Sequence, residues 1–197
     1  MQAKSVAIVL LAAGNARRFG ADKLIVEFEG APLGARVAHE LVSIAAAAHF
    51  AVCQPEAIIA AHYARLGFDI VDNPNPGIGL SGSLHLAVEA ALRTEAQALL
   101  IALADMPCVQ AAHVETLIAA CSENVVASFD GHQPMPPAMF PRAHWPDLLA
   151  TAGDAGARHI LAHAEKIAAP AGMLRDIDTV DDLAASKVSL HRIDRLQ

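Results

Sequence analysis

Two arginines and a lysine follow the first apolar run of the chain and form a candidate anion-binding loop. Residues 6–10 are all apolar, which predicts a buried strand. The next segment, residues 11–23, contains two glycines, Arg17 and Arg18, and it ends at Lys23. Backbone N–H groups approach an anion closely at glycine, and arginine and lysine neutralise its charge. The loop therefore favours polyphosphate binding, although an ordinary strand-to-helix turn with solvated basic residues has the same composition.

The glycine spacing in this loop differs from that of two well-known nucleotide-binding loops. Residues 11–23 contain neither the pattern G-x-G-x-x-G nor the pattern G-x-x-x-x-G-K-[ST]. Phosphate binding at this place must therefore use another kind of loop.

A single carboxylate follows the most apolar stretch of the chain. Residues 98–103 are all apolar, and Asp105 comes shortly after them, before Pro107. Ligands bind at the carboxyl ends of strands in open parallel sheets, so packing explains an aspartate here poorly. Mg²⁺ prefers oxygen ligands and is usually held by one or two carboxylates together with phosphates. Asp105 is therefore a candidate magnesium ligand, and the alternative is an aspartate that caps a turn or helix.

A second group of carboxylates lies near the end of the chain. Thr179 and Asp182 have the spacing of a capping box, which predicts the start of a helix. Asp176 and Asp178 precede it on a predicted strand near 174–177, where alternation places both on one face. Two carboxylates on one face repel each other unless a cation or an arginine lies nearby.

Predicted strands and helices alternate between these candidate residues. We expect strands at residues 6–10, 50–53, 68–71, 98–103, 125–127, 138–140 and near 174–177. Helices are expected at residues 33–47, 55–65, 111–121, 144–150 and 155–164. Residues 81–83 are expected to lead into a further helix, which ends at about residue 94. Residues 130–137 are rich in glycine and proline and predict a long loop. The alternation predicts an α/β fold with a mostly parallel sheet covered by helices on both faces.

Length and composition restrict the classes of protein further. The 197 residues suit a single domain, 1–197, with a polar tail at 187–197 that we expect to be loosely held. No apolar run approaches the roughly 20 residues of a membrane span, and no signal peptide is expected, so we expect a cytoplasmic protein. A net charge of −7 without a basic block argues against extended nucleic-acid binding. The three cysteines are far apart, which favours reduced thiols.

Several strings resemble a known family of enzymes. The pattern L-A-A-G-x-x-x-R-F-G-x-x-K at residues 11–23 resembles the signature of nucleotidyltransferases, most closely the molybdenum cofactor (molybdopterin) nucleotidyltransferases. Similar matches are L-A-D-M-P at 103–107, G-L-S-G-S-L at 79–84, G-D-A-G-A-R at 153–158 and D-I-D-T-V-D-D-L at 176–183. The resemblance implies a Rossmann-like three-layer α/β/α fold.

The resemblance also implies functions for particular residues. Arg18 and Lys23 would hold phosphates, and Asp105 and Asp178 would bind Mg²⁺, with Asp176 as the second choice for Asp178. Ser81 or Ser83 would face the base of the nucleotide, unless these hydroxyls only cap a helix. The implied catalytic residues are Arg18, Lys23 and Asp105. The implied nucleotide-binding residues are Leu11, Ala12, Ala13, Gly14, Arg18, Lys23, Asn73, Ser81, Ser83 and Asp105.

The implied reaction moves a nucleoside monophosphate from a nucleoside triphosphate to molybdopterin and releases pyrophosphate. Guanylyl-transferring relatives tend to carry L-A-G-G and cytidylyl-transferring ones L-A-A-G, so Ala13 favours CTP. The methyl group of Ala13 would crowd a purine more than a pyrimidine. Arg158, in the G-D-x-G-A-R segment, would lie near the second substrate. The chain departs from the family where Pro136-Pro137 replaces a Gly-His pair, which affects contacts with that substrate.

Two other functions remain open from the sequence. One is a related nucleotidyltransferase that acts on a sugar phosphate or a small phosphorylated acid. The other is a non-catalytic adaptor that binds nucleotide or pterin and delivers the cofactor to a client molybdoenzyme. An adaptor would bind the ligand without releasing pyrophosphate.

Overall fold

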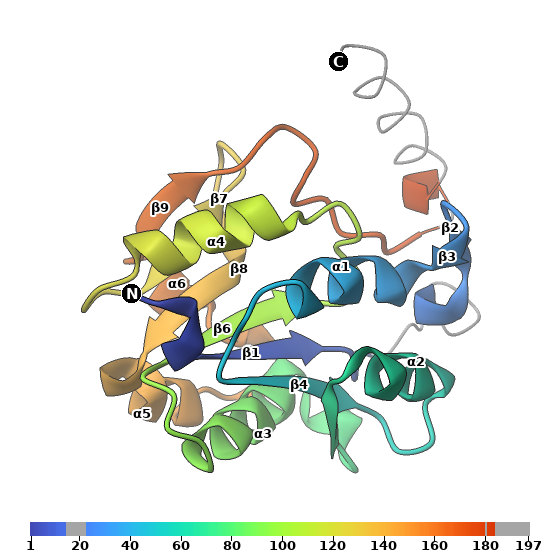
Figure 1. Ribbon diagram of the computed structural model, residues 1–197, viewed down its shortest axis with the longest axis horizontal. Helices are drawn as coiled ribbons and strands as arrows, with labels where there is room; N and C mark the ends of the chain where they lie inside the picture. Colours follow the sequence, from blue (N-terminus) through green and yellow to red (C-terminus); the bar gives the residue numbers. More distant parts are fainter. Residues whose placement is uncertain (15–22, 180, 184–197) are drawn as a thin grey trace.

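The computed structural model describes residues 1–14, 23–179 and 181–183. A seven-stranded sheet with the order β5-β4-β1-β6-β8-β7-β9 forms its centre (Figure 1). Only β8 runs antiparallel to its neighbours in this sheet. The strands are β1 (Val6–Leu11), β4 (Ala48–Cys53), β5 (Asp69–Asp72), β6 (Ala98–Leu103), β7 (Val126–Phe129), β8 (Pro134–Pro141) and β9 (Glu165–Ala168), and a separate antiparallel pair is β2 (Glu27–Phe28) with β3 (Ala31–Pro32).

Helices cover both faces of the sheet, which confirms the predicted Rossmann-like α/β fold. One apolar core packs α1, α2 and α4 against the sheet, and a second core on the other face packs α3, α5 and α6. No helix in the described part of the chain is long and apolar enough to cross a membrane. The α-helices are α1 (Leu33–Val42), α2 (Ile58–Leu66), α3 (Leu80–Leu92), α4 (Ala111–Ala120), α5 (Trp145–Leu149) and α6 (Arg158–Leu161). The 3₁₀ helices are η1 (Ala3–Ser5), η2 (Lys23–Ile25), η3 (Pro76–Ile78), η4 (Arg142–His144) and η5 (Gly153–Ala155).

The two central strands explain where a ligand site can form. β1 and β6 are apolar along their whole length because both faces are covered, and alternate β1 residues enter opposite cores. They pair in parallel from Val6 with Ala98 to Leu11 with Leu103, so their carboxyl ends lie side by side at one edge. Ligands collect at this edge in open parallel sheets.

The first predicted helix is shorter than expected. We predicted helix over 33–47, but α1 ends at Val42 although alanines of high helix propensity follow. The Ser43 hydroxyl donates to the Glu40 carbonyl at 2.6 Å in a tightened last turn. The Ala47 amide then donates to the Val6 carbonyl at 2.8 Å, which draws the chain onto the sheet. Pairing with the sheet therefore outweighs the local propensity for helix.

Three further helix predictions differ from the structure in their bounds. The helix predicted at 55–65 begins three residues later, at Ile58. The helix predicted at 144–150 is divided between η4 and α5, and the one predicted at 155–164 is reduced to the short helix α6.

The last strand lies elsewhere than predicted. Residues 174–177 form no strand: Leu174 and Ile177 pack into the first core without a ladder, so the placement of Asp176 and Asp178 on a strand was wrong. The last strand is β9, which lies at one edge of the sheet and pairs in parallel with β7. Most of β9 is exposed, so it has no apolar run that the sequence could reveal.

The prediction of a loop over 130–137 was wrong in its second half, because β8 begins at Pro134. Proline cannot donate to a ladder and is tolerated in a sheet mainly at edges and bulges. Here Ala127 pairs with Ala138 and Ser128 with Met135, so Pro136 and Pro137 lie in a bulge between the two pairs. The bulge removes the need for their missing amide hydrogens.

A buried polar network at this bulge should contribute measurably to the stability of the fold. The hydroxyl of Ser128, which is fully buried, donates to the Pro137 carbonyl at 2.7 Å and accepts from His113 Nε2 at 2.9 Å. Burial lowers the pKa of His113, which favours its neutral ring. We expect Ser128→Ala to lower the free energy of unfolding by about 1–3 kcal/mol, because two buried groups lose their partner.

Urea unfolding of Ser128→Ala measures this loss. Thr116→Ala is the matched control. Like Ser128, Thr116 donates a hydrogen bond from its hydroxyl to a backbone carbonyl, here that of Ala112 on α4, but its side chain is exposed. A loss for Ser128→Ala no larger than that of the control would contradict the role assigned to the network.

Candidate functional site

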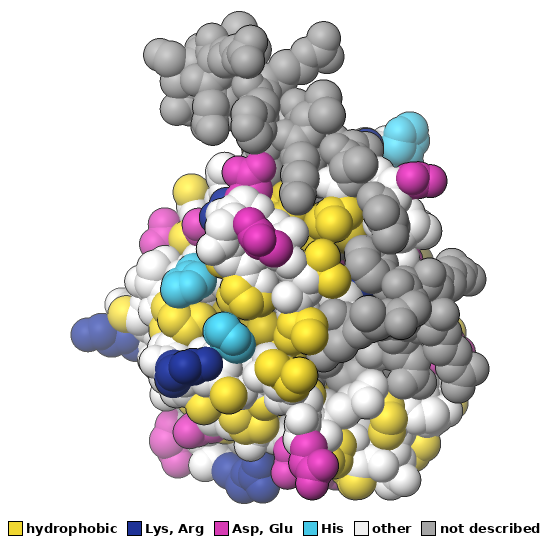
Figure 2. Space-filling model, turned by 90° about the vertical axis from the view of Figure 1, so that its right-hand side faces the viewer, with side chains coloured by type: hydrophobic (Ala, Val, Ile, Leu, Met, Phe, Trp, Pro, Cys, Tyr) yellow, Lys and Arg dark blue, Asp and Glu magenta, His cyan; other side chains and the backbone are white. Residues whose placement is uncertain are grey.

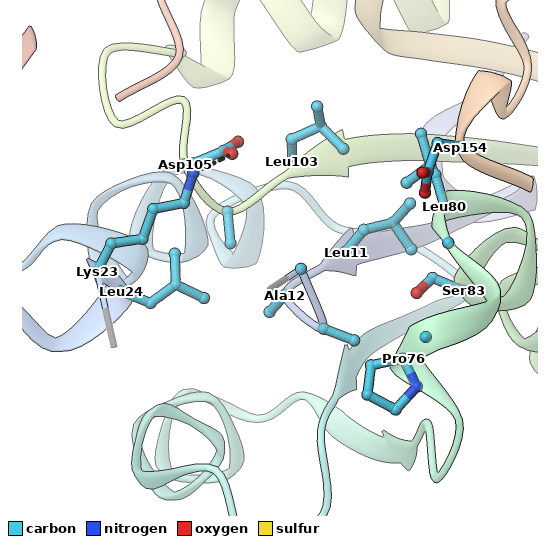
Figure 3. A pocket seen from close by; sticks show the side chains of 15 residues that line it. Leu11, Ala12, Lys23, Leu24, Pro76, Leu80, Ser83, Leu103, Asp105 and Asp154 are labelled. Atoms are coloured by element: carbon cyan, nitrogen blue, oxygen red, sulfur yellow. Dashed lines mark hydrogen bonds and ion pairs between the residues drawn. The ribbon is translucent and has the colours of Figure 1, made fainter. Parts of the chain in front are cut away.

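A cavity of about 440 Å³ opens at the carboxyl ends of β1 and β6 (Figure 3). The end of β1 lies along one side of it, and η3 and the start of α3 lie on another. Asp105, in the turn after β6, and Lys23, in η2, complete the lining of the cavity. Seven of the predicted nucleotide-binding residues line this cavity: Leu11, Ala12, Ala13, Gly14, Lys23, Ser83 and Asp105.

Of the other three predicted residues, two do not line the cavity and one lies outside the described residues. Arg18 lies outside the described residues, as does Arg17. Ser81 is buried in the first turn of α3. Asn73 is also buried, and its Nδ2 donates to Ser83 Oγ at 3.0 Å. Asn73 therefore orients a serine that does line the cavity.

Lys23 joins the two predicted metal-binding carboxylates. Its Nζ lies 2.8 Å from Asp105 Oδ2 and 2.6 Å from Asp178 Oδ1. Only 11% of the Lys23 side chain is exposed, against 24% for Asp105 and 47% for Asp178. Burial alone lowers the pKa of Lys23, but the two carboxylates outweigh this effect and the net pKa is raised. The lysine is therefore held in its charged form.

Three distant segments position these side chains. Asp105 follows β6 in a turn, and its carbonyl accepts from the Ile177 amide at 3.0 Å, which fixes the C-terminal segment beside it. Thr179 and Asp182 form the predicted capping box, with the Thr179 amide donating to Asp182 at 2.9 Å and the Asp182 amide donating to the Thr179 hydroxyl at 3.1 Å. This local structure holds Asp178 at the cluster.

The donor set at this cluster fits a hard divalent cation. Asp105 Oδ1 is buried and has no hydrogen-bond partner among the described residues, although buried carboxylate oxygens are normally paired. The Lys23 ammonium already lies between the two carboxylates, at a position that suits positive charge. The described residues contain no cluster of three or more metal-ligating side chains. Two carboxylates suffice for Mg²⁺ when substrate phosphates complete the ligand set.

Asp176 lies close enough to Lys23, Asp105 and Asp178 for their charges to affect its pKa. Burial raises the pKa of Asp176, and the negative charges of Asp178 and Asp105 raise it further. This carboxyl makes no hydrogen bond to Lys23, in contrast to Asp178. The structure therefore favours Asp178 over Asp176 as the partner of Asp105.

Several lining residues were not predicted from the sequence. Gly77 and Gly79 approach the cavity at the start of α3, and Asp154 from η5 lies beside them. Residues 77–82 read G-I-G-L-S-G, and this G-x-G-x-x-G spacing before a helix was the available signal for the glycines. Asp154 lies in the G-D-A-G-A-R string at 153–158, but that resemblance indicated only a place near the second substrate, because the contact with this cavity depends on how η5 packs against α3. Arg158 is exposed on α6 and does not line the cavity.

Comparison with known proteins gives matches over most of the chain. The model of the MobA-like NTP transferase domain matches residues 8–168. The phosphoenolpyruvate guanylyltransferase of Sphaerobacter thermophilus is 37% identical over 138 residues, which cover 66% of this chain and 64% of that protein. The purine catabolism protein PucB of Bacillus subtilis is 31% identical over 195 residues, which cover 88% of this chain and 92% of that protein.

Solved structures share the fold at lower identity. A Mycobacterium sp. strain JC1 homologue of Rv0371c has a TM-score of 0.80 at 24% identity, covering 98% of this chain and 100% of that one. Rv0371c of Mycobacterium tuberculosis in complex with manganese has a TM-score of 0.74 at 18% identity, with coverage of 94% and 99%. Molybdopterin-guanine dinucleotide biosynthesis protein A of Archaeoglobus fulgidus has a TM-score of 0.66 at 19% identity, with coverage of 94% and 99%.

Proposed function

Since the chain belongs to the family of MobA-like NTP transferase domains, we propose that it transfers the cytidylyl group of CTP to molybdopterin. Membership of this family makes the protein a nucleotidyltransferase. The products proposed here are the molybdopterin dinucleotide and pyrophosphate, and the proposed metal is Mg²⁺. The observation that carries the proposal is the cluster of Lys23, Asp105 and Asp178, of which Lys23 and Asp105 line the same cavity as residues 11–14.

The chemistry requires no nucleophile or strong base from the protein. The acceptor phosphate is already anionic at neutral pH, and its oxygen attacks the α-phosphorus while pyrophosphate leaves. Lys23 neutralises phosphate charge, and the backbone of residues 11–14 positions the nucleotide. A divalent cation on Asp105 and Asp178 would stabilise the charge that develops on the phosphates. The residues therefore act by position and charge rather than by covalent catalysis.

The proposed preference for CTP depends on Ala13. This residue lines the cavity, and only 3% of it is exposed. Gln54 Nε2 donates to the Ala13 carbonyl at 3.2 Å, which fixes the backbone at this place. A methyl group that cannot move away leaves less room for a purine than for a pyrimidine.

We expect Ala13→Gly to lower the ratio of kcat/KM for CTP over that for GTP without inverting the preference. One methyl group in a pocket contributes about 1–3 kcal/mol to discrimination, which is roughly 10–200-fold. Steady-state kinetics with both nucleotides measures the ratio, and Ala12→Gly is the matched control because Ala12 also lines the cavity. An unchanged ratio would assign the selectivity to other residues.

A specific observation favours a second candidate function. The relative from Sphaerobacter thermophilus is named as a phosphoenolpyruvate guanylyltransferase. Its phosphorylated carboxylic acid is an acceptor of the class that the sequence left open. The second candidate is therefore guanylyl transfer from GTP to a small phosphorylated acid at the same site.

Pairwise turnover distinguishes the two candidates. Pyrophosphate release would be measured for ATP, CTP, GTP and UTP, each with molybdopterin, with phosphoenolpyruvate and without acceptor. Our proposal expects the highest rate for CTP with molybdopterin. Highest turnover with GTP and phosphoenolpyruvate would replace it with the second candidate, and nucleotide binding without any pyrophosphate would indicate an adaptor.

A further inference from the structure

The two ends of the nucleotide cavity differ in charge. Lys23 and Asp105 lie at one end, and Asp154 lies beside Leu80 at the other, with Leu11 and Ala12 between them and Ser83 on the side of Leu80 (Figure 3). The first end has an ammonium group, whereas the second has a carboxylate. A nucleoside triphosphate has the same asymmetry, because its phosphates are strongly anionic and its nucleoside is neutral.

Close packing holds Asp154 at its end of the cavity. Gly79, which precedes α3, has a φ of +92°, and a Cβ added there would collide with Asp154 Oδ1 and lie 2.9 Å from the Gly153 carbonyl carbon. Gly156 likewise lies against Leu80, so that an added Cβ would be 2.6 Å from Leu80 Cδ2. Glycines on both sides therefore allow η5 to rest directly on the start of α3.

In the described part of the chain, no hydrogen bond or ion pair accounts for the position of the Asp154 carboxylate. It lies beside the start of α3, yet no side chain caps the amides of that helix. Hydrogen bonds and ion pairs found among residues 1–14, 23–179 and 181–183 do not include its carboxylate. The carboxylate therefore faces the cavity with its acceptor oxygens available.

We propose that Asp154 is a specificity-determining residue that accepts hydrogen bonds from the nucleoside end of the substrate. A carboxylate repels phosphates, so it directs the triphosphate toward Lys23 and selects a neutral group with N–H or O–H donors for itself. A ligand is usually oriented in its pocket by a small number of polar groups, and Asp154 is one of them here. The inference deepens the proposed function and depends on it.

Two parts of a nucleoside carry such donors. The ribose presents two adjacent hydroxyl groups, and the base presents the amino group of cytosine or the adjacent N–H donors of guanine. Both are hydrogen-bond donors to an anionic acceptor, which strengthens the bond relative to a neutral acceptor. A nucleotide that keeps the base but lacks the two ribose hydroxyls, such as 2′,3′-dideoxy-CTP, distinguishes these two sources.

The test compares a complete nucleotide with its phosphate part alone. Isothermal titration calorimetry would measure binding of CTP, 2′,3′-dideoxy-CTP, GTP and inorganic tripolyphosphate to the full chain and to Asp154→Asn. We expect Asp154→Asn to bind CTP about tenfold more weakly. Tripolyphosphate should bind equally or more tightly, since a negative charge has been removed. Asp69→Asn is the control, an exposed carboxylate on β5 that does not line the cavity.

Weaker binding of CTP together with unchanged or tighter binding of tripolyphosphate would support the inference, because misfolding would weaken both. If Asp154→Asn leaves the affinity for dideoxy-CTP unchanged, the ribose hydroxyls are the donors. If the affinity for dideoxy-CTP falls as much as that for CTP, the base is the donor. Unchanged or tighter CTP binding by Asp154→Asn, with normal binding by the wild type, would overturn the inference and leave the proposed function standing. A wild type that binds none of the nucleotides would overturn both.

Discussion

Lys23→Ala is expected to keep its fold and lose most of its nucleotidyl transfer. The ammonium group lies within 2.8 Å of both Asp105 and Asp178 and faces the cavity that we assign to the phosphates. Removing one charge-assisted contact costs about 2–4 kcal/mol of transition-state stabilisation, or roughly 30–1,000-fold in rate.

Pyrophosphate release and circular dichroism would be measured on the same Lys23→Ala sample. Lys4→Ala is the control, because Lys4 is exposed in η1 and distant in sequence from the loop. Turnover near that of the wild type in a folded Lys23→Ala protein would contradict the role of this lysine.

Neutralising Asp105 or Asp178 should weaken both metal binding and metal-dependent activity. The two carboxylates share Lys23 as a neighbour, and one buried oxygen of Asp105 has no partner within residues 1–14, 23–179 and 181–183. Residues that act as one unit are non-additive, so the double variant should lose little more than the worse single variant. If Asp105 only capped a turn, Asp105→Asn would cost about 1 kcal/mol of stability and leave the magnesium dependence unchanged.

Two readouts separate these possibilities. The first is kcat against magnesium concentration for Asp105→Asn, Asp178→Asn and the pair, and the second is Mn²⁺ binding to the free protein by calorimetry. Asp181→Asn is the matched control, because this exposed carboxylate lies three residues from Asp178. Losses that multiply in the double variant, with unchanged Mn²⁺ affinity, would remove Asp178 from the site.

The elements with apolar runs were the ones that the sequence predicted well. β1 and β6 are buried on both faces, so every residue in them is apolar and the pattern is unambiguous. The exposed edge strand β9 lacks this pattern and was missed. Leu174 and Ile177 are apolar for another reason, since their side chains fill the core below a segment without a ladder.

The site was predictable where its residues lie next to a strong element. Asp105 follows β6, and residues 11–14 follow or end β1, so the sheet edge alone brings them together. Asp178 is 155 residues from Lys23, and only the resemblance to a family suggested their meeting. Asp154 lies in the G-D-A-G-A-R string but was not predicted to line this cavity, because its position results from glycine contacts between η5 and α3. Such contacts between distant segments leave no periodic pattern in the sequence.

The most direct test of the account follows the two ends of the triphosphate separately. CTP labelled at the α-phosphorus and CTP labelled at the γ-phosphorus would each be incubated with molybdopterin, magnesium and the protein. We predict that the α label appears in the molybdopterin product and the γ label in pyrophosphate, in equal amounts, and that Asp105→Asn lowers both together. Appearance of the γ label in orthophosphate or in the acceptor, with no α label transferred, would contradict nucleotidyl transfer at this site.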